Sequence, residues 1–323
     1  MATKPIIVGV DGSPESLRAA AQAAAIASAA HAQLVAVHAV PVIPAFTGVA
    51  GIEPMPGFSP ELQLEVSRAS RAHIERALEK IAPKHELEVQ VGPAAVVIAE
   101  VARRRRAELV VLGGKRHGPL ARGLGRSTAH YLVRTLEMPV LIVGESAAPI
   151  THVLAAVDLS PVSLPTAKAA QRIAHLLGAR LRLLHVVERL RFADLAPDLW
   201  NEQEYRQRSE EMFRRFAAPV EDVATEDRVV RHGMPEEQIV QEAGAWHADL
   251  VVVGSHGKGW VDRVLVGSTT QQLVTDLPAS LLVVPAGRTP VVSLDLARAR
   301  ARKPAARRGL RPAPKRSRAP RGK

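Results

Sequence analysis

The stretch from Gly254 to Thr269, GSHGKGWVDRVLVGST, has the residue types of an anion-binding loop. It follows an apolar run, Leu250 to Val253, that is typical of a buried parallel strand, and a helical pattern begins near Ser268. Glycine lets the backbone approach a ligand closely, and a helix start presents free N–H groups at a positive dipole end. We therefore expect this loop to bind phosphate.

An acidic residue ends another apolar strand of the same half. Asp158 follows Val153 to Val157 and is followed by Ser160 and Pro161. In an open parallel sheet, ligands bind beyond the carboxyl ends of the strands, where the strand order reverses. If the strands ending at Asp158 and Gly254 flank that point, the carboxylate suits a ribose or an adenine amino group. Together with the glycine loop it predicts a nucleotide site.

The elements that position this site occur twice along the chain. The first copy predicts strands at 5–10, 33–40, 87–91, 109–112 and 140–143, with helices at 14–30, 60–81, 95–105 and from 127. The same order recurs, with Ser160 and Pro161 repeating Ser13 and Pro14. Alternating strands and helices predict α/β domains with parallel sheets. We expect domains at 1–146 and 150–286.

Composition excludes several classes of protein. The 323 residues are 47% hydrophobic, so two sizeable cores are expected, and at 3% aromatic those cores must be aliphatic. Without cysteine there is no disulfide, thiolate metal site or cysteine nucleophile. No leader-like N-terminus and no apolar run of about 18 residues occur, which favours a soluble cytoplasmic protein without a membrane span.

The net charge of +11 belongs to the C-terminal segment. Residues 288–323 carry 13 Lys and Arg against the single acid Asp295, whereas residues 1–287 are almost neutral. Such a segment, 287–323, cannot bury enough apolar surface to fold alone, so we expect a disordered basic tail. Several roles remain open for it: a solubilising extension, contact with phosphates of nucleic acid or a ribosome, or contact with anionic lipid.

The strand ending in Asp11 or Asp158, together with Gly254-x-x-Gly257, nine residues and Gly267-Ser268, resembles the universal stress protein family in tandem form. The resemblance implies two Rossmann-like sandwiches, each a five-stranded parallel sheet in the order 3-2-1-4-5. It also implies pairing through the fifth strands, here 140–143 with 281–284. Such pairing would make an intramolecular pseudo-dimer, and a homo-oligomer stays open.

The resemblance also implies ATP, with or without Mg²⁺, as the bound cofactor. Asp158 would approach the base and ribose, and Val186 would lie by the adenine. Gly254 and Gly257 would line the ribose and phosphates. The phosphate chain would be held by Gly267, Ser268 and Thr269.

The first copy departs from this pattern, because Arg116 stands in place of Gly257 and Arg126 in place of Gly267. The altered loop is either remodelled around the arginines or clamps phosphate with them. Nucleotide binding is therefore expected in the second copy and left open in the first. The candidate binding residues of the first copy are Asp11, Ala39, Gly113, Arg116, Arg126 and Ser127.

No catalytic motif accompanies these sites. The sequence contains no P-loop, no Gly-x-Ser-x-Gly elbow, no His-Glu-x-x-His and no metal-ligand spacing. We expect His38 and His185 to be structural. The predicted function is ATP-dependent stress-response regulation by binding, with at most slow hydrolysis. The alternative is a nucleic-acid- or ribosome-associated stress protein whose tail makes the contact.

Overall fold

The computed structural model describes residues 4–42, 59–114, 128–146, 148–161, 163–188, 202–221, 223–255 and 266–285. The basic segment 287–323 and most of both glycine loops lie outside them. In the described part, no helix is long and apolar enough to span a membrane.

The two copies form one ten-stranded sheet in the order β3-β2-β1-β4-β5-β10-β9-β6-β7-β8. The first repeat contributes β1 (Ile6–Gly9), α1 (Pro14–Ala30), β2 (Leu34–Val40), α2 (Pro60–Leu78), β3 (Glu86–Val91), α3 (Ala94–Arg104), β4 (Leu109–Gly113), α4 (Thr128–Thr135) and β5 (Val140–Val143). The second contributes β6 (His152–Val157), α5 (Leu164–Leu177), β7 (Arg180–Val187), α6 (Glu202–Ala217), η4 (Thr225–Asp227), β8 (Arg228–His232), α7 (Pro235–Ala245), β9 (Leu250–Gly254), α8 (Ser268–Thr275) and β10 (Ser280–Val284).

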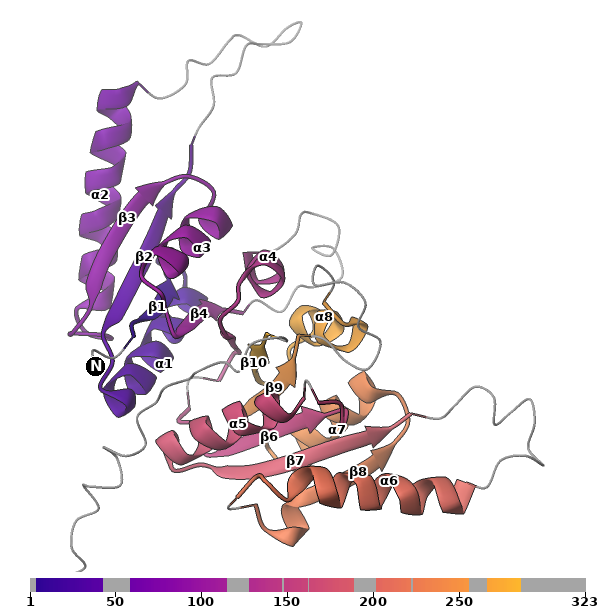
Figure 1. The fold of residues 1–323 in the computed structure, drawn as a ribbon. Helices are drawn as coiled ribbons and strands as arrows, with labels where there is room; N and C mark the ends of the chain where they lie inside the picture. Colours follow the sequence, from indigo (N-terminus) through magenta and orange to yellow (C-terminus); the bar gives the residue numbers. More distant parts are fainter. Residues whose placement is uncertain are drawn as a thin grey trace, which may run out of the picture.

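Each half has the predicted order 3-2-1-4-5, and the fifth strands join the halves (Figure 1). β5 and β10 pair antiparallel, with Leu281 opposite Ile142 and Val283 opposite Val140. All other strand pairs are parallel. The expected pairing of 140–143 with 281–284 is confirmed.

Both faces of the sheet are covered by helices, which explains why its strands are continuous apolar runs. Successive side chains of a strand point to opposite faces. Ile6 and Val8 therefore join the core beneath α1, α2, α5 and α6, whereas Ile7 joins the core beneath α3, α4, α7 and α8. The second of these layers also carries the candidate site.

The helix after β6 begins later than the repeat predicts. In the first repeat α1 begins at Pro14, and Ser13 caps it by accepting a hydrogen bond from the Ser16 N–H at 3.3 Å. In the second repeat the helix begins at Leu164, not Pro161. A second proline, Pro165, lacks an N–H and would break a helix that had started at Pro161, whereas it is tolerated in the first turn of α5.

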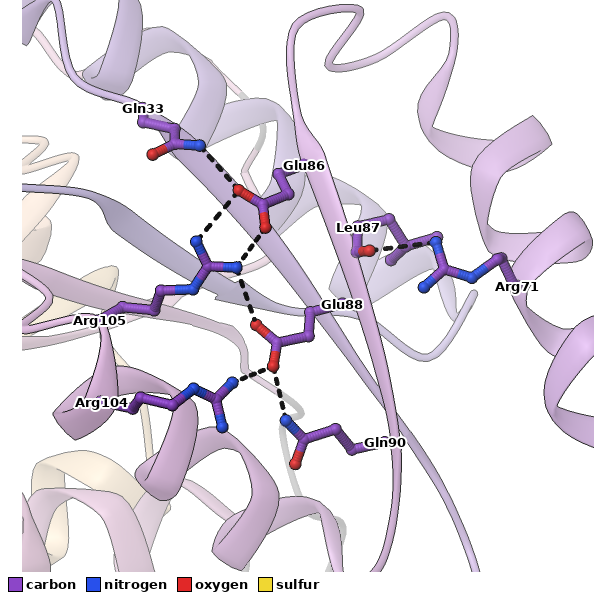
Figure 2. Close-up of polar contacts among 8 residues, drawn as sticks. All are labelled: Gln33, Arg71, Glu86, Leu87, Glu88, Gln90, Arg104 and Arg105. Atoms are coloured by element: carbon purple, nitrogen blue, oxygen red, sulfur yellow. Dashed lines mark hydrogen bonds and ion pairs between the residues drawn. The ribbon is translucent and has the colours of Figure 1, made fainter.

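An ion-pair network fastens the outer strand of the first repeat to the end of α3 (Figure 2). Arg105 pairs with Glu86 and with Glu88 of β3, and Arg104 pairs with Glu88. Gln33 donates a further hydrogen bond to Glu86 at 2.8 Å. Exposure in this network ranges from 17% for Glu88 to 39% for Glu86 and 52% for Arg104.

The second repeat has a buried ion-pair network in which the strands supply arginines, whereas the strand of the first repeat supplies glutamates. Arg182 of β7 donates to Asp227 at 2.9 Å and to Glu242 of α7 at 2.8 Å. Arg180 also pairs with Asp227, and Arg231 of β8 pairs with Glu242. Both acidic side chains are only 2% exposed. The network joins β7, β8, η4 and α7 into one unit.

A buried carboxyl lies where the two repeats meet. Glu108, just before β4, is 7% exposed, and its Oε1 has no hydrogen-bond partner in the described structure. The matching Asp249 accepts hydrogen bonds from the N–H groups of Thr151 and His152, at 2.7 and 2.9 Å. The first repeat has Pro5 in place of His152, and proline has no N–H to offer.

This difference predicts an unusual pH dependence of stability. Burial raises the pKa of Glu108 from 4.5 to about 7, which Lys4 and Arg172 offset only in part. Between pH 4.5 and about 7 the unfolded chain ionises first, so the folded state loses stability as the pH rises, by at most about 3 kcal/mol. In the Glu108→Gln variant, the free energy of unfolding measured with urea should no longer show this decrease between pH 5 and pH 8. Asp249→Asn, the matched control, should instead destabilise the protein. An unchanged pH dependence in Glu108→Gln would contradict the assignment.

Candidate functional site

The candidate site lies in the second repeat, where the order of the strands reverses. β6 and β9 are neighbours, paired from Val153 with Leu250 to Ala155 with Val252. Beyond that point β6 continues along β7, while β9 continues along β10 as far as Gly254. The carboxyl ends of the two strands therefore separate and leave a crevice, the usual ligand position in such a sheet.

Asp158 stands at the end of β6 with half of its carboxylate engaged. Its Oδ1 accepts hydrogen bonds from the N–H and the hydroxyl of Ser160, at 3.0 and 2.6 Å. Its Oδ2 is buried and has no hydrogen-bond partner in the described structure. A buried polar atom without a partner costs about 1–3 kcal/mol, so this oxygen is an acceptor suited to a ligand donor. The next residue, Leu159, has a φ of 63°, which is uncommon outside glycine.

The start of α8 lies on the other side of the crevice and is tied to β9. Gly267 occupies the N-cap position and, having no side chain, offers no capping hydrogen bond to the helix N–H groups. Its N–H donates to the carbonyl of Ser255 at 2.9 Å, and the Thr270 hydroxyl donates to the carbonyl of Gly254 at 2.8 Å. Ser268 is exposed at this helix start. The arrangement suits an anion, because the first N–H groups of a helix have no intrahelical partners.

The second strand of this repeat, β7, places the candidate residue Val186 and its neighbour His185 on opposite faces of the sheet. Val186 packs with the layer that contains α7 and α8, the face of the crevice. His185 points the other way, is 2% exposed, and stacks on Phe213 with 5.9 Å between ring centroids. Its Nδ1 lies 2.9 Å from the carbonyl oxygen of Val157, and His38 makes the same contact with Val10. Both histidines therefore brace neighbouring strands.

The corresponding position of the first repeat is a cavity of about 270 Å³. Asp11, Ala39 and Gly113, all candidates from the sequence, line it together. Asp11 Oδ1 accepts a hydrogen bond from the Ser13 N–H at 2.9 Å, as Asp158 does from Ser160. The remaining candidates lie outside the described residues: Arg116, Arg126 and Ser127 in this repeat and Gly257 in the second.

Sequence reasoning missed two features of the cavity. Gly113 is required by packing, because a Cβ there would lie 2.6 Å from the backbone carbonyl carbon of Glu15 in α1. The occurrence of glycine at both 113 and 254 was the available signal. Val274 of α8 and Leu277, just after that helix, also line the cavity, although they belong to the second repeat. Nothing in the local sequence around them indicates this contact.

Comparison with known families gives two matches along the chain. The model of the universal stress protein family matches residues 2–144 and 149–285. A universal stress protein of Mycobacterium tuberculosis is 32% identical over 284 residues, which cover 83% of this chain and 92% of that protein. One of Mycolicibacterium smegmatis is 31% identical over 294 residues, covering 86% and 96%.

Solved structures share the fold across both repeats. A putative universal stress protein from Pseudomonas aeruginosa superposes with a TM-score of 0.63 at 17% identity, covering 92% of this chain and 98% of that one. A universal stress protein from Archaeoglobus fulgidus gives a TM-score of 0.62 at 15% identity, covering 89% and 100%. At these identities the likeness concerns the fold alone.

Proposed function

Because the chain belongs to the universal stress protein family in its tandem two-domain form, we propose that its second repeat binds ATP. The observation that carries the proposal is the buried Oδ2 of Asp158, which has no hydrogen-bond partner in the described structure. It ends β6 beside β9, whose loop leads to the start of α8. An acceptor on one side and free helix N–H groups on the other complement a nucleoside and its phosphates.

Each residue has a distinct part in this proposal. Asp158 accepts a hydrogen bond from a ribose hydroxyl or the adenine amino group, and Val186 packs against the base. Gly254 and Gly257 let the backbone approach the ribose and phosphates. The phosphate chain rests on the helix start formed by Gly267, Ser268 and Thr269.

The proposed activity is binding without efficient turnover. Glycine, serine and threonine at the helix start orient phosphate, but none has a pKa near neutrality with which to move a proton. Among the described residues, no group of three His, Asp or Glu side chains is placed to hold a metal ion. In this proposal, any Mg²⁺ comes with the nucleotide phosphates. Nucleotide occupancy then regulates the conformation or association of the protein.

The direct test is to quantify nucleotide that co-purifies with the full chain. Mass spectrometry of the released ligand should identify ATP, and titration of ligand-free protein with ATP should give saturable binding. Absence of ATP binding in calorimetry of folded, ligand-free protein would contradict the proposal.

Replacing the Ser268 hydroxyl should weaken ATP without abolishing its binding. A hydrogen bond to a charged group contributes about 1.5–3 kcal/mol, so Ser268→Ala should raise the dissociation constant by roughly one to two decades. Gln272→Ala, at an exposed position of the same helix, should leave the constant unchanged. Equal constants for wild type and Ser268→Ala in calorimetry would remove Ser268 from the site.

A second candidate function is supported by the basic segment 288–323 and its 13 Lys and Arg residues. Contact with about six phosphates would make the logarithm of nucleic-acid affinity fall against that of salt concentration with a slope near −5. Deleting residues 288–323 should abolish this binding and leave ATP binding intact. Retained nucleic-acid binding in the truncated chain, measured by fluorescence anisotropy, would exclude the tail as the contact.

A further inference from the structure

The outer edge of the sheet in the first repeat is strand β3, which pairs with β2 and with no other strand of the described structure. The Gly92 N–H, just after the strand, donates to the Val40 carbonyl at 2.9 Å and therefore faces β2. Successive residues of a strand turn their backbone groups to alternate sides, so those of Leu87, Val89 and Val91 face away from the sheet. Such an edge is a template for pairing with another strand.

One arginine occupies part of this edge. Arg71 of α2 donates a hydrogen bond from its Nη1 to the carbonyl oxygen of Leu87 at 3.1 Å (Figure 2). A partner strand would need the same oxygen for its own hydrogen bonds. Among the described residues, no hydrogen bond reaches the outward groups of Val89 or Val91, and the Val91 side chain is 43% exposed. The edge is therefore closed at one outward position and open at the next two.

The sequence of β3, ELEVQV, is self-complementary when two copies pair antiparallel with Val89 on the two-fold axis. Val89 then faces the partner's Val89, and Leu87 faces the partner's Val91. Glu88 faces the partner's Gln90, so no two like charges stand directly opposite each other. Gln90 already donates to Glu88 of its own strand at 2.6 Å, and the partner's Gln90 would offer the same donor.

The charges beside this edge are balanced within one chain. Glu88 pairs with Arg104 and with Arg105, and Glu86 pairs with Arg105. Each carboxylate of β3 therefore has a guanidinium beside it before a second copy approaches. Pairing of two β3 edges brings neutral clusters together rather than unpaired carboxylates.

The opposite edge of the sheet, β8, is less suited to pairing with itself. The Gly233 N–H donates to the Val187 carbonyl at 3.1 Å, so the backbone groups of Arg228, Val230 and His232 face outward. Antiparallel pairing centred on Val230 would place Arg228 opposite the partner's His232. Two basic side chains in that position disfavour association. A closed two-fold dimer is therefore expected at β3 rather than at β8.

We propose that the free edge of β3 is an interaction surface for a second copy of this chain, which pairs antiparallel about Val89. Arg71 restrains this association by holding the carbonyl of Leu87. The surface is separate from the pairing of β5 with β10, which joins the repeats within one chain. The association does not require bound nucleotide, so it goes beyond the proposed function.

Arg71→Ala should strengthen self-association about tenfold or more, because one hydrogen bond in each copy no longer competes with the partner strand. Sedimentation equilibrium of the full chain measures the association constant. Arg71→Lys keeps a donor at the same place and should associate like wild type. Arg68→Ala, which removes another exposed arginine of the same helix, should also associate like wild type.

Two further positions, changed in the Arg71→Ala protein, test the edge and its register. Val89→Pro removes an outward N–H and leaves the bonds to β2 intact, and proline is tolerated at such an edge position. It should return the association constant to the wild-type value. Gln90→Lys should tighten the dimer about threefold by facing the partner's Glu88, and Gln90→Glu should weaken it by about the same factor.

The outcomes decide between this contact and others. Equal association of wild type and Arg71→Ala overturns the proposal, including the case in which residues 43–58, outside the described structure, cover the edge. Association of Arg71→Ala that responds to neither Val89→Pro nor the Gln90 variants places the contact elsewhere and also overturns it. Loss of the association on deleting residues 288–323 would assign it to that segment instead. Should Val89→Pro fail to fold, the opposite effects of Gln90→Lys and Gln90→Glu decide.

Discussion

Gly267→Asp is expected to weaken ATP binding by the second repeat at least a hundredfold. The added carboxylate would stand at the helix start proposed to hold the phosphates, and juxtaposed like charges cost several kcal/mol. About 3 kcal/mol corresponds to two decades in the dissociation constant. The fold should tolerate the change, because φ −59° and ψ 148° are open to any residue and aspartate is a preferred N-cap.

Gly267→Asn separates charge from size in this experiment. Asparagine has nearly the same shape and also caps helices, so it should cost less than tenfold in affinity. Gly267→Arg, which copies the residue of the first repeat, should weaken ATP by obstructing the approach of the phosphates. Calorimetric titration with ATP measures all three constants. Equal affinities for the aspartate and asparagine variants would show that no phosphate lies at this helix start.

Asp227→Asn is expected to destabilise the second repeat by about 3 kcal/mol or more. Asp227 is 2% exposed and holds both Arg180 and Arg182. Breaking a buried ion pair costs about 3–5 kcal/mol. Arg182 keeps Glu242 as a partner and Arg180 is 49% exposed, so the lower end of this range applies. For a unit of about 150 residues, a loss of 3 kcal/mol lowers the Tm by about 6–12 °C in scanning calorimetry.

Glu86→Gln provides the control, because it breaks the corresponding network of the first repeat (Figure 2). Glu86 is 39% exposed and its partner Arg105 is 33% exposed. Exposed pairs contribute about 0–1 kcal/mol, so the Tm should change by about 4 °C at most. If the two variants lower the Tm equally, burial is not what distinguishes the networks.

Large parts of the fold follow from local patterns. Apolar runs such as Leu250 to Val253 predict buried strands, and Ser13 with Pro14 predicts the start of α1, as observed. Although Ser160 and Pro161 repeat Ser13 and Pro14, α5 begins only at Leu164, because Pro165 would break a helix that had started at Pro161. The repeat predicted equivalent elements in both halves, but one additional proline changed the residue at which the first helix of the second repeat begins.

The candidate site was predictable only where one segment determines it. Asp158 and Gly254 end adjacent strands as expected, and three first-repeat candidates line one cavity. The orphaned oxygen of Asp158 was not predictable, because hydrogen-bond partners depend on the folded loop. Nor was the environment of Glu108, which reflects the missing N–H of Pro5, a residue 103 positions earlier in the chain.

The sequence by itself determined that this protein is a tandem α/β duplication with a glycine-containing loop after the fourth strand of each half. These features are encoded by the period of apolar residues and by glycine, both of which act over a few residues. Only the tertiary structure decided that Leu277 closes the cavity of the other repeat. That contact requires β5 and β10 to pair antiparallel and Gly114 to have no side chain, so it arises from segments more than 160 residues apart.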